Sequence, residues 1–289
     1  MSEAGRNIST GTTKAALLAI ITSLLLALLT LADSATIRGI ERGAQAFQSA
    51  ASNVRKLAAA GQISGAACDG LSHTPTVQAA GAIRPINPII TDQAPDVPLT
   101  AYQVSRGLAE VIGVRNPEAM GVWIEQGLAD ALYVDRGDHL TTAQDDVPVA
   151  GVFSWPDDGR DARLGFSVLV PVSSDFAFDE CWLRAWPVAD DNDQLLLATQ
   201  IVSLTPIPTQ ITQLNRNLGV ALDANGQFSG RVTRHVVWAS PLLMLMLGFV
   251  STRVRRLEYA SALHATQSRA ALLLGVCAET LIWAGLGSF

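Results

Sequence analysis

Near the C-terminus, a short segment with several charged residues, 251–269, lies between two apolar runs. Its charged side chains are Arg253, Arg255, Arg256 and Arg269 against a single acid, Glu258. Arg and Lys are retained on the cytoplasmic side of membrane proteins when they occur in short loops. The segment is therefore predicted to be a cytoplasmic loop between two membrane helices, and this placement determines the side of the membrane for the rest of the chain.

Glu279 is the ionisable residue inside the last apolar run, 270–289. A charged side chain in lipid is costly, so such residues usually face the interior of a helix bundle and carry a function. The sequence leaves two interpretations of Glu279 open. It is either an intramembrane functional group or a residue that faces a neighbouring helix or lies at shallow depth.

Three cysteines are present, and two of them, Cys68 and Cys181, fall in the polar middle of the chain. Disulfides form in oxidising compartments outside the cytoplasm. A Cys68–Cys181 disulfide is therefore permitted if the middle segment lies outside the cell, although two separate buried thiols fit the spacing equally well. The third, Cys277, lies in the last apolar run.

No constellation of catalytic residues is visible. The G-x-S-x-G, P-loop and H-E-x-x-H motifs are absent, and the four histidines are scattered. Two acidic clusters, 157–161 and 190–193, offer the oxygen ligands that calcium prefers, but neither has EF-hand spacing, so solvated turns are favoured. We expect no enzyme activity, no cofactor and no metal site. Four tryptophans of the middle segment are expected to pack in a core, with a ligand groove as the alternative: Trp123, Trp155, Trp182 and Trp186.

Three apolar runs, 15–32, 236–250 and 270–289, have the length of membrane helices, although the second contains Pro241. A secretory signal peptide is the alternative for the first run, and a buried core helix is the alternative for the second. The first run exceeds the usual apolar core of a signal peptide, and apolar residues continue beyond it at helical spacing as far as Leu57. We therefore predict a membrane helix that continues as a helical stalk.

The charge distribution supports this organisation. Residues 33–234 hold 14 basic and 23 acidic residues, net −9, whereas both ends are basic. An acidic middle segment argues against nucleic acid as a partner, because that partner requires a basic surface. The predicted divisions are a cytoplasmic tail (1–13), a first membrane helix (14–33), a helical stalk (34–60), an extracytoplasmic domain (61–234), a second membrane helix (235–252), a cytoplasmic loop (253–269) and a third membrane helix (270–289). The chain is thus expected to be a multi-pass plasma-membrane protein in contact with lipid, with residues 34–234 outside.

Strand and helix patterns are mixed in the middle segment, which indicates an α+β domain. Residues 85–98, with four prolines, are predicted to be a loop, and Asn225-Gly226 a turn. Strands are predicted at 77–84, 121–124, 140–142, 147–153, 163–172, 181–187 and 195–204. Helices are predicted at 99–114, 125–132 and 206–222.

Two groups of residues together resemble the MacB/FtsX-type ABC transporter permeases. In the loop, the family pattern is a basic residue, a Glu, a Gly, then Ser and Arg, and a later Glu in the next helix. It is matched by Arg256, Glu258, Ser268, Arg269 and Glu279, while Thr266 stands where Gly is usual. In the middle segment, residues 121–129 (GVWIEQGLA), Gly137-Asp138, residues 149–153 (VAGVF) and the strand at 77–85 resemble the extracytoplasmic core of that family.

The resemblance implies a membrane protein of three transmembrane α-helices with an α+β extracytoplasmic domain of the MacB-core type. It implies a permease-type subunit, without ATPase activity of its own, that couples ATP hydrolysis by a cytoplasmic ATP-binding cassette subunit to motion of the outside domain. A homodimer or a heterodimer with another permease is implied as well. The coupling residues would be Arg255, Arg256, Glu258, Ser268 and Arg269.

One departure from the family is the number of membrane helices, which is usually four. The alternative function is therefore a membrane-anchored binding or sensor module without ATPase coupling. The Thr at 266 and the missing helix favour this alternative, whereas Arg256, Glu258, Ser268 and Arg269 favour the permease.

Overall fold

The structure is a computed structural model that describes residues 14–115, 119–142, 145–189, 191–203, 207–264 and 268–287. The chain divides into two compact units. The first, here called the sheet domain, spans Gly43–Asp223. The second, here called the helical unit, combines the described residues up to Arg42 with those from Ala224 onward. The predicted tail, 1–13, lies outside the described residues.

The sheet domain is built on one mixed sheet, which has nine strands among the described residues, in the order β5-β6-β4-β7-β3-β2-β8-β1-β9. Two neighbouring pairs, β3 with β7 and β4 with β6, are parallel, and the other pairs are antiparallel. The strands are β1 (Val54–Ser64), β2 (Val77–Thr91), β3 (Ala94–Ser105), β4 (Val122–Glu125), β5 (His139–Thr141), β6 (Asp146–Phe153), β7 (Ser167–Val172), β8 (Ala177–Ala185) and β9 (Gln210–Gln213).

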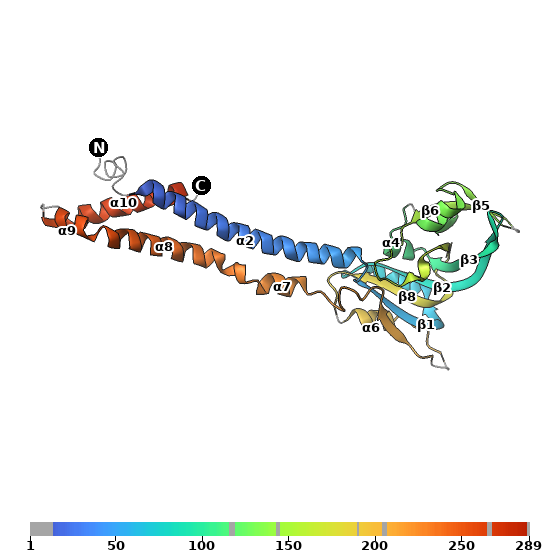
Figure 1. Ribbon diagram of the computed structural model, residues 1–289. Coiled ribbons are helices and arrows are strands. Elements are labelled where there is room, and N and C mark those ends of the chain that lie inside the picture. Colours follow the sequence, from blue (N-terminus) through green and yellow to red (C-terminus); the bar gives the residue numbers. More distant parts are fainter. Residues whose placement is uncertain are drawn as a thin grey trace. The chain divides into compact units, whose positions relative to one another are not determined.

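Strands β2 and β3 form a long hairpin (Figure 1), so the loop predicted at 85–98 is wrong. The prolines that suggested a loop lie where each strand has only one partner. Strand β2 pairs with β8 as far as Ile83, and β3 pairs with β7 from Thr100 onward. Proline is tolerated at such edge positions because no ladder hydrogen bond from its nitrogen is needed there.

The helices of the sheet domain are short. The helix predicted at 99–114 is limited to α4, because the chain continues as β3 to Ser105. The strand predicted at 195–204 is wrong, since helix α6 occupies its beginning, and the helix predicted at 206–222 contains strand β9 instead. The helical segments are α3 (Gly65–Gly70), η1 (Leu71–His73), α4 (Leu108–Ile112), α5 (Gln126–Leu132), η2 (Ala162–Leu164) and α6 (Asn192–Leu197).

The core of the sheet domain is apolar and aromatic. Trp123 and Trp182 are fully buried, and Trp155 packs 6.2 Å from Trp182 between ring centroids. Burial of side chains of this size contributes about 1.5 to 3 kcal/mol each. Three of the four tryptophans therefore pack in the core, as expected, and Trp186 is half-buried beside Phe47.

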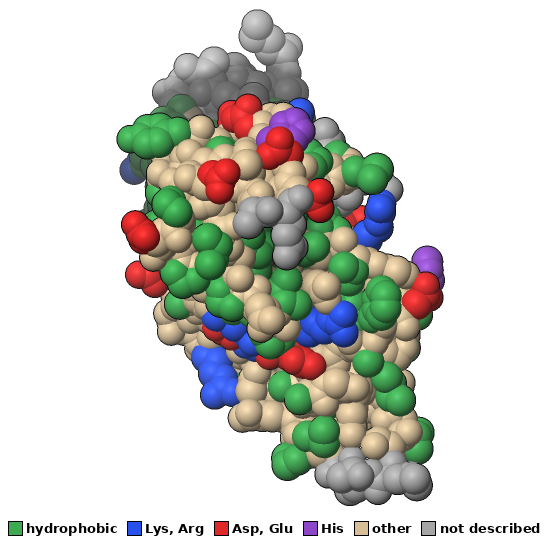
Figure 2. Space-filling model, turned by 90° about the vertical axis from the view of Figure 1, so that its right-hand side faces the viewer, with side chains coloured by type: hydrophobic (Ala, Val, Ile, Leu, Met, Phe, Trp, Pro, Cys, Tyr) green, Lys and Arg blue, Asp and Glu red, His purple; other side chains and the backbone are tan. Residues whose placement is uncertain are grey.

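Charged side chains of both signs lie on the surface. On the face drawn in Figure 2, Lys and Arg side chains lie next to Asp and Glu side chains, with hydrophobic side chains scattered between them. Interspersed charges of this kind are typical of a surface exposed to water.

The helical unit contains long apolar helices. Its segments are α2 (Ala15–Ser49, as far as Arg42), α7 (Ala224–Gly230), η3 (Val232–His235), α8 (Val236–Val254), α9 (Arg256–His264) and α10 (Arg269–Gly287). The turn predicted at Asn225-Gly226 is wrong, because both residues belong to α7.

Helix α2 ends at Ser49, so the helical stalk predicted at 34–60 is too long. Ala51 takes a positive φ of 54°, and the amide of Ser52 donates to the carbonyl of Phe47, which closes the helix in a left-handed cap. The apolar residues that continued the helical spacing, Val54 and Leu57, belong to β1 and are buried in the sheet domain.

Two helical segments are long and apolar enough to cross a membrane, Ala16–Ser49 and Val232–Val254, among the residues described. Their most apolar windows are 6% and 0% buried. A core helix of a water-soluble protein would be mostly buried, whereas these two windows are exposed. The third predicted span forms α10 but is not among these two segments.

Candidate functional site

An arginine at the junction of α8 and α9 brings two predicted site residues together. Arg255 is the residue between the two helices. Its Nε donates to Glu258 Oε2 at 2.7 Å, and its Nη1 donates to Glu279 Oε2 at 2.6 Å. One guanidinium therefore links the short helix α9 to the apolar helix α10. We call Arg255, Glu258 and Glu279 the loop triad.

The members of the loop triad differ in exposure. The side chains of Arg255 and Glu279 are 10% and 8% exposed, whereas that of Glu258 is 51% exposed. Burial lowers the pKa of Arg255, but hydrogen bonds to Glu258 and Glu279 outweigh this effect and raise it overall. Arg255 is therefore protonated, and the Glu279 carboxylate accepts a hydrogen bond from it. An intramembrane functional role for Glu279 stays a prediction.

Two aromatic residues complete this site, and the sequence analysis missed both. The ring of Tyr259 lies 5.1 Å from the Arg255 guanidinium, and Trp283 is 2% exposed in the small cavity beside Glu279. Tyr259 follows Arg255 by four positions, and its amide donates to the Arg255 carbonyl. Trp283 follows Glu279 by four positions on α10, so these two residues share a helix face. That spacing is the signal that could have revealed them.

The remaining predicted coupling residues do not join the triad. Arg256 and Arg269 are exposed, and the described residues include no acidic partner for either. The Oγ of Ser268 accepts from the amide of Ala271 at 3.2 Å, so Ser268 caps the start of α10. Thr266, the residue that departs from the family pattern, lies outside the described residues.

In the sheet domain, Cys68 of α3 and Cys181 of β8 are joined by a disulfide, with Cα atoms 5.8 Å apart. Both are fully buried, and Cys277 of the helical unit is free and exposed. Within the described part of the chain, no group of three His, Cys, Asp or Glu side chains is placed to hold a metal ion.

The first acidic cluster is occupied by internal ion pairs. Asp158 pairs with Arg160 at 2.6 Å, and Asp161 pairs with Lys56 at 2.5 Å. Burial raises the pKa of Asp161, but Lys56 and Arg163 outweigh it, so the pKa lies below its usual value. In the second cluster, Asp193 pairs with Arg55 at 2.6 Å, and Asp190 is outside the described residues.

No family model matches the sequence, and no curated protein matches it. Among solved structures, the chain is similar to the periplasmic region of MacB from Actinobacillus actinomycetemcomitans, with a TM-score of 0.41 and 11% identity over 58% of this chain and 91% of that one. It is also similar to a domain of a proposed permease protein from Porphyromonas gingivalis (TM-score 0.41, 13% identity, 60% and 94% covered). A third similarity is to the extracellular domain of the noncanonic ABC-type transporter YknZ from Gram-positive bacteria (TM-score 0.35, 13% identity, 49% and 88% covered).

Proposed function

We propose that this chain is a permease-type transmembrane subunit of an ABC transporter complex, which couples ATP hydrolysis by a cytoplasmic partner to motion of the sheet domain outside the membrane. The proposed topology has three membrane spans, 14–33, 235–252 and 270–289, in the plasma membrane. The N-terminus and the loop 253–269 are cytoplasmic, and residues 34–234 are extracytoplasmic. The subunit would dimerise with itself or with another permease and would lie in contact with lipid.

The observation that carries the proposal is the loop triad. Arg255 holds Glu258 of α9 and Glu279 of α10 at the same time, at 2.7 and 2.6 Å. Arg255 directly precedes α9 in the chain, and its pair with Glu279 is buried, so separation of the two would leave an uncompensated buried charge. The half-exposed contact with Glu258 adds less. A displacement of α9 by a partner would therefore be passed to α10 rather than absorbed by a slack loop.

Two further features suit this role. Arg256 and Arg269 are exposed on the loop and are available to acidic groups of a cytoplasmic partner. Helix α2 is continuous from Ala15 to Ser49, so it extends sixteen residues beyond the predicted first span that ends at 33. At about 1.5 Å rise per residue, this extension is roughly 24 Å of unbroken helix along which motion could be transmitted.

The test is co-purification of an ATP-binding cassette subunit from native membranes, with the full chain as bait in detergent. We expect the unmodified chain to capture the ATPase, and a chain with Arg256→Glu and Glu258→Arg to lose it. The matched control exchanges two exposed charges of α2 in the same way, Glu41→Arg with Arg42→Glu, and should retain the ATPase.

The proposal is overturned if no ATPase accompanies the unmodified chain, or if both charge exchanges retain it equally. Loss in both variants also counts against the proposal, because it would show that capture does not depend on the loop. Recovery of the sheet-domain disulfide in each variant checks that the chain has folded.

A second candidate function is a membrane-anchored binding or sensor module without ATPase coupling. It is favoured by a cavity in the sheet domain that is lined by two arginines. Capture of a small ligand without capture of an ATPase would support this candidate over the permease.

A further inference from the structure

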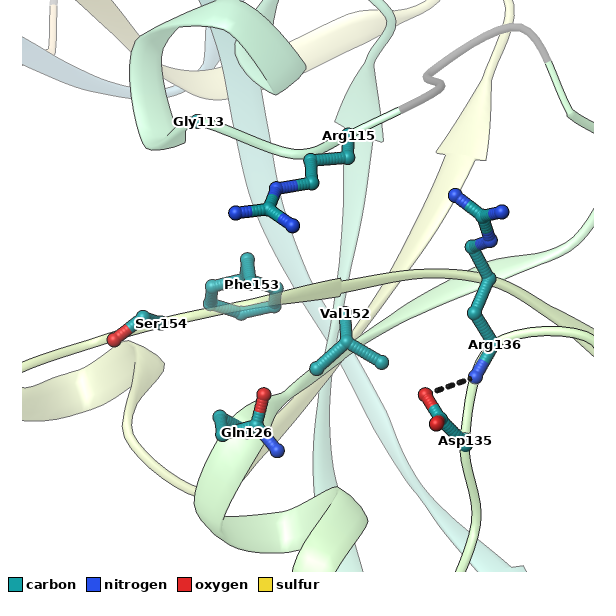
Figure 3. Close-up of a pocket in the computed structure, with 8 residues that line it drawn as sticks. All are labelled: Gly113, Arg115, Gln126, Asp135, Arg136, Val152, Phe153 and Ser154. Carbon is teal, nitrogen blue, oxygen red and sulfur yellow. Dashed lines mark hydrogen bonds between the residues drawn. The ribbon is translucent and has the colours of Figure 1, made fainter.

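The sheet domain contains a cavity of about 510 Å³, within the range of small-molecule sites. Four separate segments contribute to it: the end of α4, the start of α5, the turn before β5, and the end of β6. Figure 3 shows its lining residues, which are Gly113, Arg115, Gln126, Asp135, Arg136, Val152, Phe153 and Ser154.

The position of Arg115 is set by the end of α4. Gly113 takes a φ of 80°, and the amides of Gly113 and Val114 donate to the carbonyl of Ala109 at 2.8 and 2.9 Å. The side chain of Val114 is buried against Gly151 of β6, where an added Cβ would come within 2.9 Å of Val114 and 3.3 Å of the Arg115 carbonyl. The absence of a side chain at Gly151 therefore lets Arg115 approach the strand, and its guanidinium extends toward Val152 and Phe153 (Figure 3).

The position of Arg136 is set by a hydrogen-bonded turn. Its backbone amide donates to Asp135 Oδ1 at 2.6 Å, and the amide of Asp135 donates to Asp138 Oδ2 at 2.7 Å. The amide of Gly137 donates to the carbonyl of Val149 on β6 at 2.9 Å. The carboxylate of Asp135 thus serves the turn, and the Arg136 side chain extends away from it, as Figure 3 shows.

These two arginines differ from three others of the sheet domain. Arg55, Arg160 and Arg163 each form a 2.6 Å ion pair with a carboxylate. Arg115 and Arg136 are exposed and have no ion pair among the described residues, although the middle segment has a net charge of −9. Two cations without carboxylate partners at one cavity favour an external anion, and guanidinium groups match the geometry of a carboxylate.

The rest of the lining indicates what accompanies the anion. Val152 and Phe153 supply an apolar strand surface, and Gln126 and Ser154 supply hydrogen-bonding side chains. We propose that this cavity binds the carboxylate end of a short peptide or acylated amino acid, with the carboxylate at Arg115 and Arg136 and the adjoining amide near Gln126 and Ser154. The site needs only the sheet domain and does not rest on ATPase coupling.

The test is calorimetric titration of the full chain in detergent with N-acetyl-L-alanine, which carries a carboxylate beside an amide. We expect saturable binding that weakens at least tenfold in Arg115→Gln and in Arg136→Gln. The neutral N-acetyl-L-alaninamide should bind at least tenfold more weakly than the acid. Arg216→Gln, an exposed change outside the cavity lining, is the matched control and should leave binding unchanged.

Several results would overturn the assignment. Equal binding of the acid and the amide would exclude a role for the carboxylate, and equal loss in Arg216→Gln would indicate a general charge effect. If inorganic phosphate binds as tightly as N-acetyl-L-alanine, the cavity is an unselective oxyanion site instead. Absence of binding at millimolar concentration also rejects the proposal, and none of these results affects whether an ATPase co-purifies.

Discussion

The two units of this chain differ in the side chains that they bury. In the sheet domain, aliphatic and aromatic residues such as Trp123, Phe178 and Leu183 are fully buried. In the described part of the helical unit, the buried residues are Thr22, Glu279 and Trp283, while leucines such as Leu245 are exposed. The first pattern is that of a domain folded in water. The second differs from it, because many apolar side chains of these helices are exposed and two of the three buried residues are polar.

This difference teaches where each unit obtains its stability. The sheet domain depends on apolar burial and on a covalent crosslink in its core. In the described part of the helical unit, ion pairs join separate segments, and the Arg255–Glu279 pair of the loop triad is the most buried of them. Substitutions that are severe in one unit should therefore be mild in the other, and the following predictions test that contrast from the largest expected effect to the smallest.

Loss of the disulfide should have the largest effect. The two cysteines are 113 positions apart in the sequence. A crosslink that closes a loop of this length lowers the conformational entropy of the unfolded chain, which stabilises the folded state by about 4 to 5 kcal/mol. We expect Cys68→Ala with Cys181→Ala to lower the urea midpoint of the sheet domain strongly, as measured by circular dichroism in detergent. Cys277→Ala should leave that midpoint unchanged, and an equal shift in both variants would contradict the prediction.

A charge in the middle of α8 should oppose membrane insertion. Leu245 is 71% exposed, and replacement by Arg at the centre of a membrane helix costs about 3 kcal/mol. We expect Leu245→Arg to reduce the inserted fraction in a glycosylation-mapping assay. Val202→Arg, at a fully exposed position of the sheet domain, should have no effect on insertion. Equal insertion of Leu245→Arg and the unmodified chain would mean that α8 does not face lipid.

Removal of Glu279 should weaken the packing of the loop against α10. Arg255 keeps Glu258 as a partner, so we expect Glu279→Leu to cost about 2 kcal/mol, less than the loss of an isolated buried pair. Replacement of both Arg255 and Glu279 by Leu should cost less than Glu279→Leu alone, because no buried charge is then left unpaired. Unfolding by titration with SDS measures both; a double variant less stable than the single one would argue against a buried pair.

Acid should weaken the sheet domain through Asp161. The pKa of Asp161 is lower in the folded state than its value of 3.8 in the unfolded chain. The stability that Asp161 contributes is therefore fully present above pH 3.8 and is lost as the pH falls through the lower, folded-state pKa. Asp161→Asn should remove about 1 kcal/mol near neutral pH and make unfolding less dependent on pH below 4. Urea unfolding across the acid range measures this effect. An unchanged acid profile would show that the Lys56–Asp161 pair contributes nothing.

The sequence predicts best where one pattern has one explanation. The strand and helix around Gly121–Leu132 and the apolar helix at 236–250 are confirmed, because hydrophobic run and turn signals agree there. The sequence predicts secondary structure poorly where strand pairing overrides the preferences of the individual residues. Pro85 and Pro88 are typical of a loop, but the segment that contains them pairs with β3 along one edge and is therefore a strand. Likewise, Val54 and Leu57 extend a helical spacing although they lie in β1.

The site shows the same division. Position in the chain placed Arg255 and Glu258 in one loop and Glu279 in the next helix, but it did not show that Arg255 pairs with both acids. The side of a helix on which a side chain lies decides that pairing, and a change of helix axis between α8 and α9 is not visible in a sequence. The two arginines of the cavity are even less accessible to sequence reasoning, since 115 and 136 are separated by a helix and a strand.

The crosslink between Cys68 and Cys181 also constrains how the molecule is made. A ribosome adds roughly 5 to 20 residues per second, so Cys181 is added about 6 to 23 seconds after Cys68, from which it is separated by 113 positions in the sequence. Strands β2 to β7 emerge during that interval, and Cys181 lies in β8, between β2 and β1. On the proposed topology, the bond can close only after β8 has been translocated. Oxidation would then distinguish chains in which strands β1 to β8 have been made from chains that stalled earlier, while the edge strand β9 is still to come.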